Sequence, residues 1–456
     1  MKLKYFAFLA VLLSALGLAA NERLLAFYFS DDGEISSAAF RMAILAFRTT
    51  MFILGAGILP VAMLVGPARL AKLFPRIGLL LCSLLISLAL AESAVRIIIP
   101  TPFAIDESQR LFQYHPRLGH EFIPGIAGIA AIPFESKQLV AINSHGMRNP
   151  EIAMAKPPGV RRLAVLGDSF TSNLLVPSEK VFTAVLENAL RGQWEVLNFG
   201  VDGYSTLQEW MLFEEKAVAF KPDAAILVFY LRNDLYDNAG YHDSPEKNHR
   251  PLGRLLPGGE FEIYNVPCPV HPQTDTIQSG LQRLRITDFH IFNLARKFSS
   301  AREYILVNSY PEVDMFDPNV PEWLAPNWLL FESILARLKA SCNELDIPLY
   351  LVSAPTILQV YENEYWPKVR NNRQLADRFD PTFPSRMLAE ICSRHDIPIV
   401  DLLPPLAAHA RNGESLYFRI FQHWNELGNR RVAEFLADFL SNRFSSPASP
   451  LHPSTK

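Results

Sequence analysis

The chain contains one short segment whose residue types suit nucleophilic catalysis. Residues 163–170 read Leu-Ala-Val-Leu-Gly-Asp-Ser-Phe, so an apolar run typical of a strand ends in Gly-Asp-Ser. A serine between a strand and a helix is exposed, and nearby backbone amides can stabilise an oxyanion. Ser169 is therefore the first candidate nucleophile. The triplet is weak on its own, because Asp and Ser are also ordinary helix caps.

Three further residues occupy places where a matching active site would need them. Gly203 ends the turn Gly-Val-Asp-Gly, and glycine lets a backbone amide approach a ligand closely. Asn233 follows an apolar run, and its side-chain amide can donate to an oxyanion. His423 precedes the last helical pattern and can act as a general base. Each residue alone is equally well explained as a turn, a cap or an exposed side chain.

The elements that must position these residues alternate regularly along the chain. Short apolar runs are followed by amphipathic segments, which predicts an open parallel α/β sheet of about five strands with helices on both faces. In such sheets, sites form beyond the carboxyl ends of the strands. We expect strands at 163–166, 196–199, 224–231, 349–353 and 397–400, and helices at 180–190, 206–220, 327–345, 386–394 and 426–440.

Taken together, the four motifs resemble the SGNH hydrolase superfamily, also called GDSL-type esterases and lipases. Residues 167–170 are similar to its first sequence block, Gly203 within 198–204 to the second, Asn233 to the third and His423 to the fifth. The resemblance covers about 161–439. Residues 143–148 also resemble a segment that precedes the serine in membrane-tethered bacterial members.

This resemblance implies a flavodoxin-like three-layer sandwich that hydrolyses esters through an acyl-enzyme. Ser169 would attack the ester carbonyl, and His423 would take its proton and later activate water. The backbone amides of Ser169 and Gly203 and the side chain of Asn233 would form the oxyanion hole. No spacing of cysteine and histidine indicates a metal site, and we expect no cofactor.

One departure from the family concerns the acid that orients the histidine. The family usually carries an Asp three residues before the histidine, and this chain has Ile420 there. Either a backbone carbonyl holds the ring in a Ser-His dyad, or an acid comes from elsewhere, with Asp401 and Glu414 as candidates. Loss of a triad acid can lower turnover by about 10⁴, so weak activity or a catalytically silent protein stays open.

The first hundred residues contain three apolar stretches, at 5–20, 49–66 and 77–99. A membrane-spanning helix needs about 20 mostly apolar residues, which predicts two or three transmembrane helices; the first stretch could instead be a cleaved signal peptide. The loop at 21–42 carries Asp31, Asp32 and Glu34, whereas the loop at 67–76 carries Arg69, Lys72 and Arg76. Because basic loops stay cytoplasmic, the rest of the chain is expected outside a bacterial cytoplasmic membrane.

The expected organisation is a membrane anchor at 1–100, a linker and pocket-rim segment at 101–160, a hydrolase-like domain at 161–444 and a disordered tail at 445–456. A long insertion at 236–325 includes one amphipathic helix near 289–298. Cys342 and Cys392 precede equivalent strands, so a disulfide is one alternative and two buried free thiols the other.

Composition narrows the functional classes. Of the 456 residues, 49% are hydrophobic, so most of the chain can fold. The net charge of −3 gives no support for nucleic-acid binding. We expect a membrane-anchored extracytoplasmic serine esterase acting on an acyl ester, for example an O-acetyl group, of a surface glycan or lipid. The alternatives are an O-acyltransferase of a surface polysaccharide and a weak or inactive glycan-binding or assembly protein.

Overall fold

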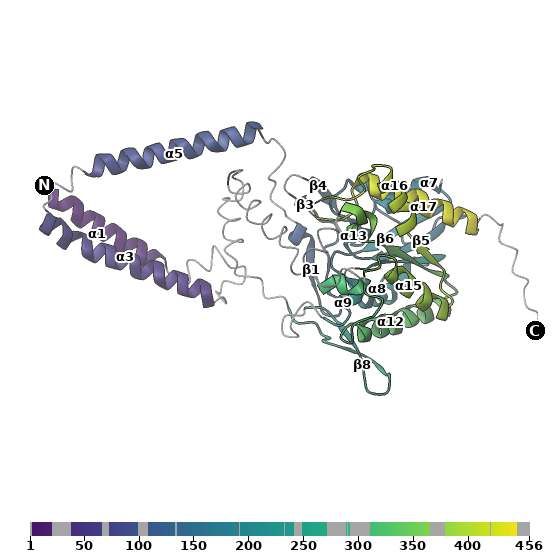
Figure 1. Ribbon diagram of the computed structural model, residues 1–456. Helices are drawn as coiled ribbons and strands as arrows, with labels where there is room; N and C mark the ends of the chain where they lie inside the picture. The colour runs from purple at the N-terminus through teal and green to yellow at the C-terminus, as the bar shows by residue number, and fades with distance from the viewer. Residues whose placement is uncertain are drawn as a thin grey trace, which may run out of the picture. The chain divides into compact units, whose positions relative to one another are not determined.

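A computed structural model (Figure 1) describes residues 2–20, 38–65, 73–98, 108–132, 135–190, 192–231, 233–240, 249–270, 289, 291, 311–364, 379–419 and 421–444. The chain divides into two compact units. One comprises residues 1–105 with 271–302, and the other comprises residues 106–270 with 303–456.

The described residues of the first unit form the helices α1 (Lys2–Ala19), α3 (Ala38–Val65) and α5 (Leu73–Ile98), of which α1 and α3 pack against each other. Among the described residues, no helix is both long and apolar enough to cross a membrane. The two or three transmembrane helices predicted from the sequence are thus not supported. The first apolar stretch forms a helix of 18 residues, which is shorter than the roughly 20 residues that a spanning helix needs.

The second unit is built on the predicted parallel sheet of five strands, which is confirmed. The strands lie in the order β11-β10-β7-β5-β6, and every neighbouring pair is parallel. β5 lies between β6 and β7. Because the three strands are parallel, the loops that follow them leave the sheet at the same edge. The strands are β5 (Arg161–Gly167), β6 (Trp194–Gly200), β7 (Ala224–Tyr230), β10 (Leu349–Ala354) and β11 (Ile399–Asp401).

Helices cover both faces of this sheet, which makes three layers (Figure 1). On β5, Ala164 and Leu166 point into one apolar cluster, and Leu163 and Val165 point into the other. The first cluster is covered by α8 (Thr206–Glu215), α12 (Ala325–Glu344) and α15 (Phe383–Arg394). The second is covered by α7 (Phe182–Ala189), α13 (Ile357–Val360), α16 (Leu403–Arg411) and α17 (Glu426–Phe444).

Short antiparallel pairs and turns surround the sheet. The expected linker segment forms the pairs β1–β2 and β3–β4, and the expected insertion contains the pair β8–β9. The helix expected near 289–298 lies outside the described residues, apart from residues 289 and 291, and so does the tail at 445–456. The pairs are β1 (Phe112–His115) with β2 (Gly119–Phe122), β3 (Ala127–Ile132) with β4 (Ser136–Ala141), and β8 (Leu252–Leu255) with β9 (Phe261–Tyr264).

The two cysteines that precede β10 and β11 are not bonded to each other. Cys342 and Cys392 are both free and buried. Burial raises the pKa of each thiol to about 12, so both remain protonated and inert near neutral pH. Of the two alternatives that the sequence left open, the structure shows the free thiols.

Candidate active site

The turn after β5 presents Ser169 at the carboxyl edge of the sheet. Ser169 opens the short helix α6 (Ser169–Ser172), and the Asp168 side chain caps it by accepting a hydrogen bond from the Phe170 amide at 2.8 Å. Ser169 is partly exposed, whereas Asp168 and Phe170 on either side are fully buried. The sequence therefore leaves the serine as the accessible polar group of this turn.

A glycine on the neighbouring strand allows α6 to lie directly on the sheet. A Cβ atom at Gly200, the last residue of β6, would lie 2.5 Å from the Ser172 nitrogen and 2.6 Å from the Thr171 Cβ atom. Any larger residue at this position would push α6 away. The glycine thus fixes how closely the serine turn packs against β6.

The side chains of Ser169 and His423 meet at this edge. The Nε2 atom of His423 lies 2.7 Å from the Oγ atom of Ser169, although the residues are 254 positions apart in the sequence. This is within hydrogen-bond distance. The convergence that the predicted mechanism requires is therefore present.

The other nitrogen of the His423 ring faces a backbone carbonyl. Its Nδ1 atom lies 2.8 Å from the carbonyl oxygen of Phe421. Because that oxygen can only accept, Nδ1 carries the hydrogen and Nε2 is left as an acceptor for the Ser169 hydroxyl. Gln422 between them has a φ of 59°, a left-handed conformation that is rare outside glycine.

Neither of the two carboxylates considered from the sequence bonds to the His423 ring among the described residues. Asp401 accepts a hydrogen bond from the Leu403 amide at 3.0 Å, and burial raises its pKa. Hydrogen bonds from Arg431 lower the pKa of Glu414 to about 2. In the part of the chain that the structure describes, a carbonyl faces Nδ1, as the dyad alternative requires. Ile420 lies outside the described residues.

Two aromatic rings hold the His423 ring between them. The rings of Phe170 and Phe421 each stack on it, with a centroid distance of 4.6 Å in both cases. Phe170 is itself packed edge-on against the buried Trp424 at 4.8 Å and tilted against Tyr230 at 4.0 Å. Stacking on two sides restricts rotation of the imidazole and keeps Nε2 directed at the serine.

The loop that carries His423 is tied both to itself and to the serine turn. The Phe418 amide donates to the His423 carbonyl at 2.8 Å, and Tyr417 and Trp424 form an isolated antiparallel bridge. The Asn173 side chain, directly after α6, donates to the Trp424 carbonyl at 2.9 Å. These bonds place the histidine loop against the end of α6.

The loops after β6 and β7 bring the expected oxyanion donors to the same edge. The Val201 amide donates to the carbonyl of Gly167 at 3.0 Å, which joins the Gly203 loop to the serine turn. Gly203 has a φ of 75°, a conformation that favours glycine. No hydrogen bond within the described residues occupies the backbone amides of Ser169 or Gly203. The Asn233 side chain contacts Asp168.

Arg148 anchors the serine turn from behind. Its buried guanidinium donates to the carbonyls of Ser172 at 2.6 Å, Asn173 and Val176. Burial lowers the pKa of Arg148 to about 10, and the charge of Asp202 partly counters this effect. Arg148 thus supplies a buried support for α6, and the expectation that 101–160 forms part of the pocket rim stays a prediction.

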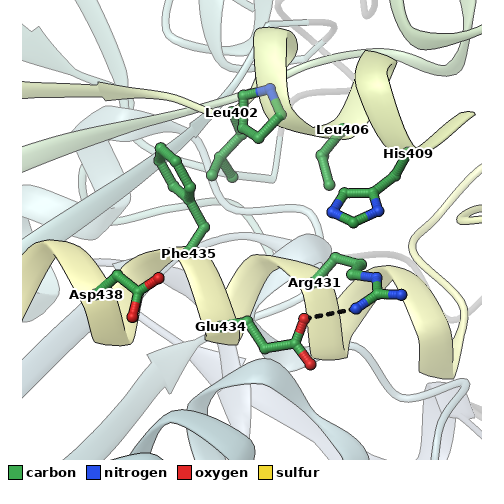
Figure 2. Close-up of a pocket in the computed structure, with 8 residues that line it drawn as sticks. Leu402, Leu406, His409, Arg431, Glu434, Phe435 and Asp438 are labelled. Atoms are coloured by element: carbon green, nitrogen blue, oxygen red, sulfur yellow. Dashed lines mark hydrogen bonds and ion pairs between the residues drawn. The ribbon is translucent and has the colours of Figure 1, made fainter. Parts of the chain in front are cut away.

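A separate cavity of about 190 Å³ lies between α16 and α17 (Figure 2). Figure 2 shows Arg431 paired with Glu434 beside it. Neither Ser169 nor His423 is among the residues that line it, so it is not part of the site described here. The lining residues are Leu402, Pro405, Leu406, His409, Arg431, Glu434, Phe435 and Asp438.

Several contributors to this site were not identified from the sequence. The backbone carbonyl of Phe421 faces the His423 ring, and the type of residue 421 does not reveal this. The stacking of Phe170 on His423 joins two loops that are far apart in the sequence. Arg148 was noted only as part of a motif. The available signal was a single arginine within the otherwise uncharged or histidine-containing residues 142–149. In the described part of the chain, no group of His, Cys, Asp and Glu side chains is arranged to hold a metal ion.

No protein family model matches the chain, and no curated protein matches it either. Several solved structures of esterases are similar to part of it. An acetyl xylan esterase is 14% identical over 61% of this chain and 99% of its own, with a TM-score of 0.35. The lipase/acylhydrolase from Enterococcus faecalis is 11% identical over 62% and 97%, with a TM-score of 0.33.

A catalytic mutant of an acetylxylan esterase from Geobacillus stearothermophilus is 13% identical, over 62% of this chain and 95% of its own, with a TM-score of 0.33. Identities and TM-scores this low carry no inference about what this chain does. Its chemistry has to be inferred from the Ser169–His423 geometry.

Proposed function

We propose that this protein is a serine ester hydrolase that works through an acyl-enzyme and uses a Ser-His dyad. One observation carries the proposal: the Ser169 Oγ atom lies 2.7 Å from His423 Nε2, while Nδ1 of the same ring is held by a carbonyl. A partly exposed hydroxyl next to a base with a fixed tautomer is the arrangement that activates serine.

The proposed reaction has two halves. As the Ser169 Oγ atom bonds to the acyl carbon, its proton moves to Nε2 of His423. The negative carbonyl oxygen is stabilised by the backbone amides of Ser169 and Gly203 and by the Asn233 amide. The C–O bond to the alcohol then breaks, and the alcohol leaves with the proton from His423. Water attacks the acyl group with the same base, which releases the acid and restores Ser169.

Hydrolysis of an aryl acetate by the full-length chain tests this proposal. We expect the wild-type protein to release the phenol catalytically and Ser169→Ala to lose at least 10³-fold in kcat/KM. A fluorophosphonate probe should label the wild-type protein and not the variant. Ser415→Ala, which changes a serine elsewhere in the same unit, is the matched control and should be labelled like the wild type. Hydrolysis that persists unchanged in Ser169→Ala would refute the proposal.

The finer assignments remain part of the proposal. The sequence favours an acyl ester of a surface glycan or lipid, with an O-acetyl group as one candidate, and a location outside a bacterial cytoplasmic membrane. The location rests on the charge difference between the loops at 21–42 and 67–76. A membrane-impermeant fluorophosphonate applied to spheroplasts tests it: labelling of Ser169 only after lysis would contradict an outside location.

Two alternatives are decided by the same assays. An O-acyltransferase would pass the acyl group to a sugar hydroxyl, so added glycan would divert the acyl group from water to a new ester. A non-catalytic glycan-binding or assembly protein is favoured only by the missing carboxylate at Ile420. It predicts no labelling of Ser169 and no turnover.

A further inference from the structure

Three buried carboxyl groups lie directly behind the serine turn. They belong to Asp168, to Glu209 on α8 and to Asp234, the first residue of α9 (Asp234–Asp237), and all three residues are fully buried. Asp168 Oδ2, Asp234 Oδ1 and both carboxyl oxygens of Glu209 have no hydrogen-bond partner. Within the described residues, no lysine or arginine forms an ion pair with any of them. A buried charge without partners is strongly unfavourable.

The neighbouring groups make ionisation of Asp168 still less favourable. The pKa of Asp168 is raised to about 7, and burial is the largest cause. Hydrogen bonds from Phe170 and Asn233 lower this pKa, whereas the negative charges of Asp202 and Asp237 raise it. Glu209 and Asp234 also face Asp168, and burial followed by mutual repulsion raises the pKa of both well above the usual range. Among the described residues, the groups whose charges act on Asp168 are acidic: Asp202 after β6, Glu209 on α8, and Asp234 and Asp237 on α9. The titratable His423 lies on the other side of the turn, against Ser169.

The side chain next to Asp168 is the expected oxyanion donor Asn233. Its Oδ1 atom is buried without a partner, and the hydrogen bond between the Asn233 side chain and Asp168 lowers the pKa of that carboxyl group. An amide can turn either end towards a carboxyl group. A neutral carboxyl donates to Oδ1, whereas an ionised carboxylate accepts from Nδ2. The charge on Asp168 therefore decides which end of the Asn233 amide remains available to a substrate.

We propose that Asp168 is a positioning residue that acts as a neutral carboxylic acid. Its Oδ1 atom accepts from the Phe170 amide, and its protonated Oδ2 atom donates to Asn233 Oδ1, which directs Nδ2 to the oxyanion. This role rests on the proposed esterase function. Loss of the proton turns Nδ2 towards Asp168 and places a negative charge beside the oxyanion. Both changes oppose catalysis, since removing one oxyanion donor typically lowers turnover by about 10²–10³.

The proposal predicts an alkaline limb in the pH profile that a single substitution removes. For wild-type protein, kcat/KM for an aryl acetate should fall roughly tenfold per pH unit above about 7, because this profile reports ionisations of the free enzyme. Asp168→Asn should stay within about tenfold of wild type at pH 6 and lose the alkaline limb. An asparagine still accepts from Phe170 through Oδ1 and donates to Asn233 through Nδ2, with no proton to lose.

Controls separate this role from a purely structural one. Ser169→Ala gives the background rate at each pH, and Asp346→Asn, an exposed residue after α12, should keep the wild-type profile. Asp168→Ala removes the donor and should lose 10²-fold or more at every pH. The proposal is overturned if folded Asp168→Asn loses 10²-fold at pH 6, or if the alkaline limb survives in it.

An infrared measurement tests the protonation state without relying on activity. The difference spectrum between wild type and Asp168→Asn at pH 6 should contain the C=O band of a protonated carboxylic acid, which vanishes as the pH rises past about 8. Absence of this band would overturn the proposal. If the wild-type protein hydrolyses no ester at all, the proposed function and the catalytic role of Asp168 fail together, while the band still decides whether the group is neutral.

Discussion

The Nδ1 atom of His423 lies 2.8 Å from the backbone carbonyl oxygen of Phe421, two residues earlier in the chain. In a Ser-His-Asp triad this place is taken by a carboxylate, which both fixes the tautomer and stabilises the imidazolium. A carbonyl fixes the tautomer equally well, but it carries no net charge to stabilise the protonated ring. We therefore expect a competent site that turns over more slowly than one with a full triad.

If Ser169 and His423 form a dyad, substitution of either side chain should remove the activity. Ser169→Ala and His423→Ala should each lower kcat/KM for an aryl acetate by 10³-fold or more, because neither the nucleophile nor the base acts without the other. The double variant should be no slower than the slower single variant, since residues that act as one unit are not additive. Losses that multiply in the double variant would contradict a proton transfer between them.

The stacking of Phe421 on His423 should matter more for catalysis than for stability. Phe421 is 44% exposed, so Phe421→Ala removes less buried surface than the loss of a fully buried phenylalanine. We expect kcat to fall several-fold to tenfold because the imidazole gains freedom, and the free energy of unfolding to change by less than about 1 kcal/mol. Stopped-flow assays and urea denaturation measure the two effects.

Two matched phenylalanines test this interpretation. Phe435→Ala on α17 removes a ring that is 38% exposed and does not stack on His423, and it should leave kcat unchanged. Phe170→Ala removes a fully buried ring and should reduce the free energy of unfolding by about 3–5 kcal/mol. If Phe421→Ala and Phe435→Ala affect kcat equally, the stacking has no catalytic role.

The sheet could be predicted from the sequence because its strands are buried on both faces. Runs such as 224–230 are apolar throughout, which distinguishes them from amphipathic helices. The helix α16 was not predicted. It begins Leu-Pro-Pro, and proline usually indicates a break, yet Pro404 and Pro405 fall in the first turn, where no amide partner is needed. The pairs β1–β2 and β3–β4 escaped exact placement because strands of four to six residues carry little pattern.

The pairing of Ser169 with His423 was expected from the resemblance of their motifs. Topology accounts for Ser169, Gly203 and Asn233, which follow parallel strands and so share one edge of the sheet. The sequence did not decide whether a carbonyl or an acid faces Nδ1 of His423, because any residue type can supply a backbone carbonyl. The burial of acidic side chains could not be predicted from the sequence either. Glu209 lies in a helical segment where a sequence pattern would place an exposed acid, and only the packing of α8 shows that it is inside.

Arg148 is predicted to be a stability determinant of the serine turn. Arg148→Met keeps much of the apolar volume but leaves the carbonyls of Ser172, Asn173 and Val176 without their donor. We expect the free energy of unfolding to fall by about 3 kcal/mol, as for other broken buried charge networks. Arg148→Lys should recover only part of this loss, because one ammonium cannot reproduce the fork of the guanidinium.

The control for Arg148 is an arginine with an exposed partner. Arg254 pairs with Glu262 at 2.5 Å on the β8–β9 pair, and both side chains are largely exposed. Arg254→Met should leave the free energy of unfolding close to that of the wild type, because exposed ion pairs contribute little to stability. Equal losses in Arg148→Met and Arg254→Met, measured by denaturant titration, would contradict a special role for the buried guanidinium.

Glu209 should make the protein less stable as the pH rises. Burial, followed by the charge of Asp168, raises its pKa well above the usual value. Between the unfolded and folded pKa values the folded state binds more protons, so its stability is fully present below about pH 4 and falls as the pH rises. Glu209→Gln removes this penalty and should raise the free energy of unfolding by about 1–3 kcal/mol at pH 8, with no gain at pH 4.

Glu344→Gln, an exposed control, should stay within about 0.5 kcal/mol at both pH values. Destabilisation by Glu209→Gln at pH 8 would show that the buried carboxyl has a stabilising partner.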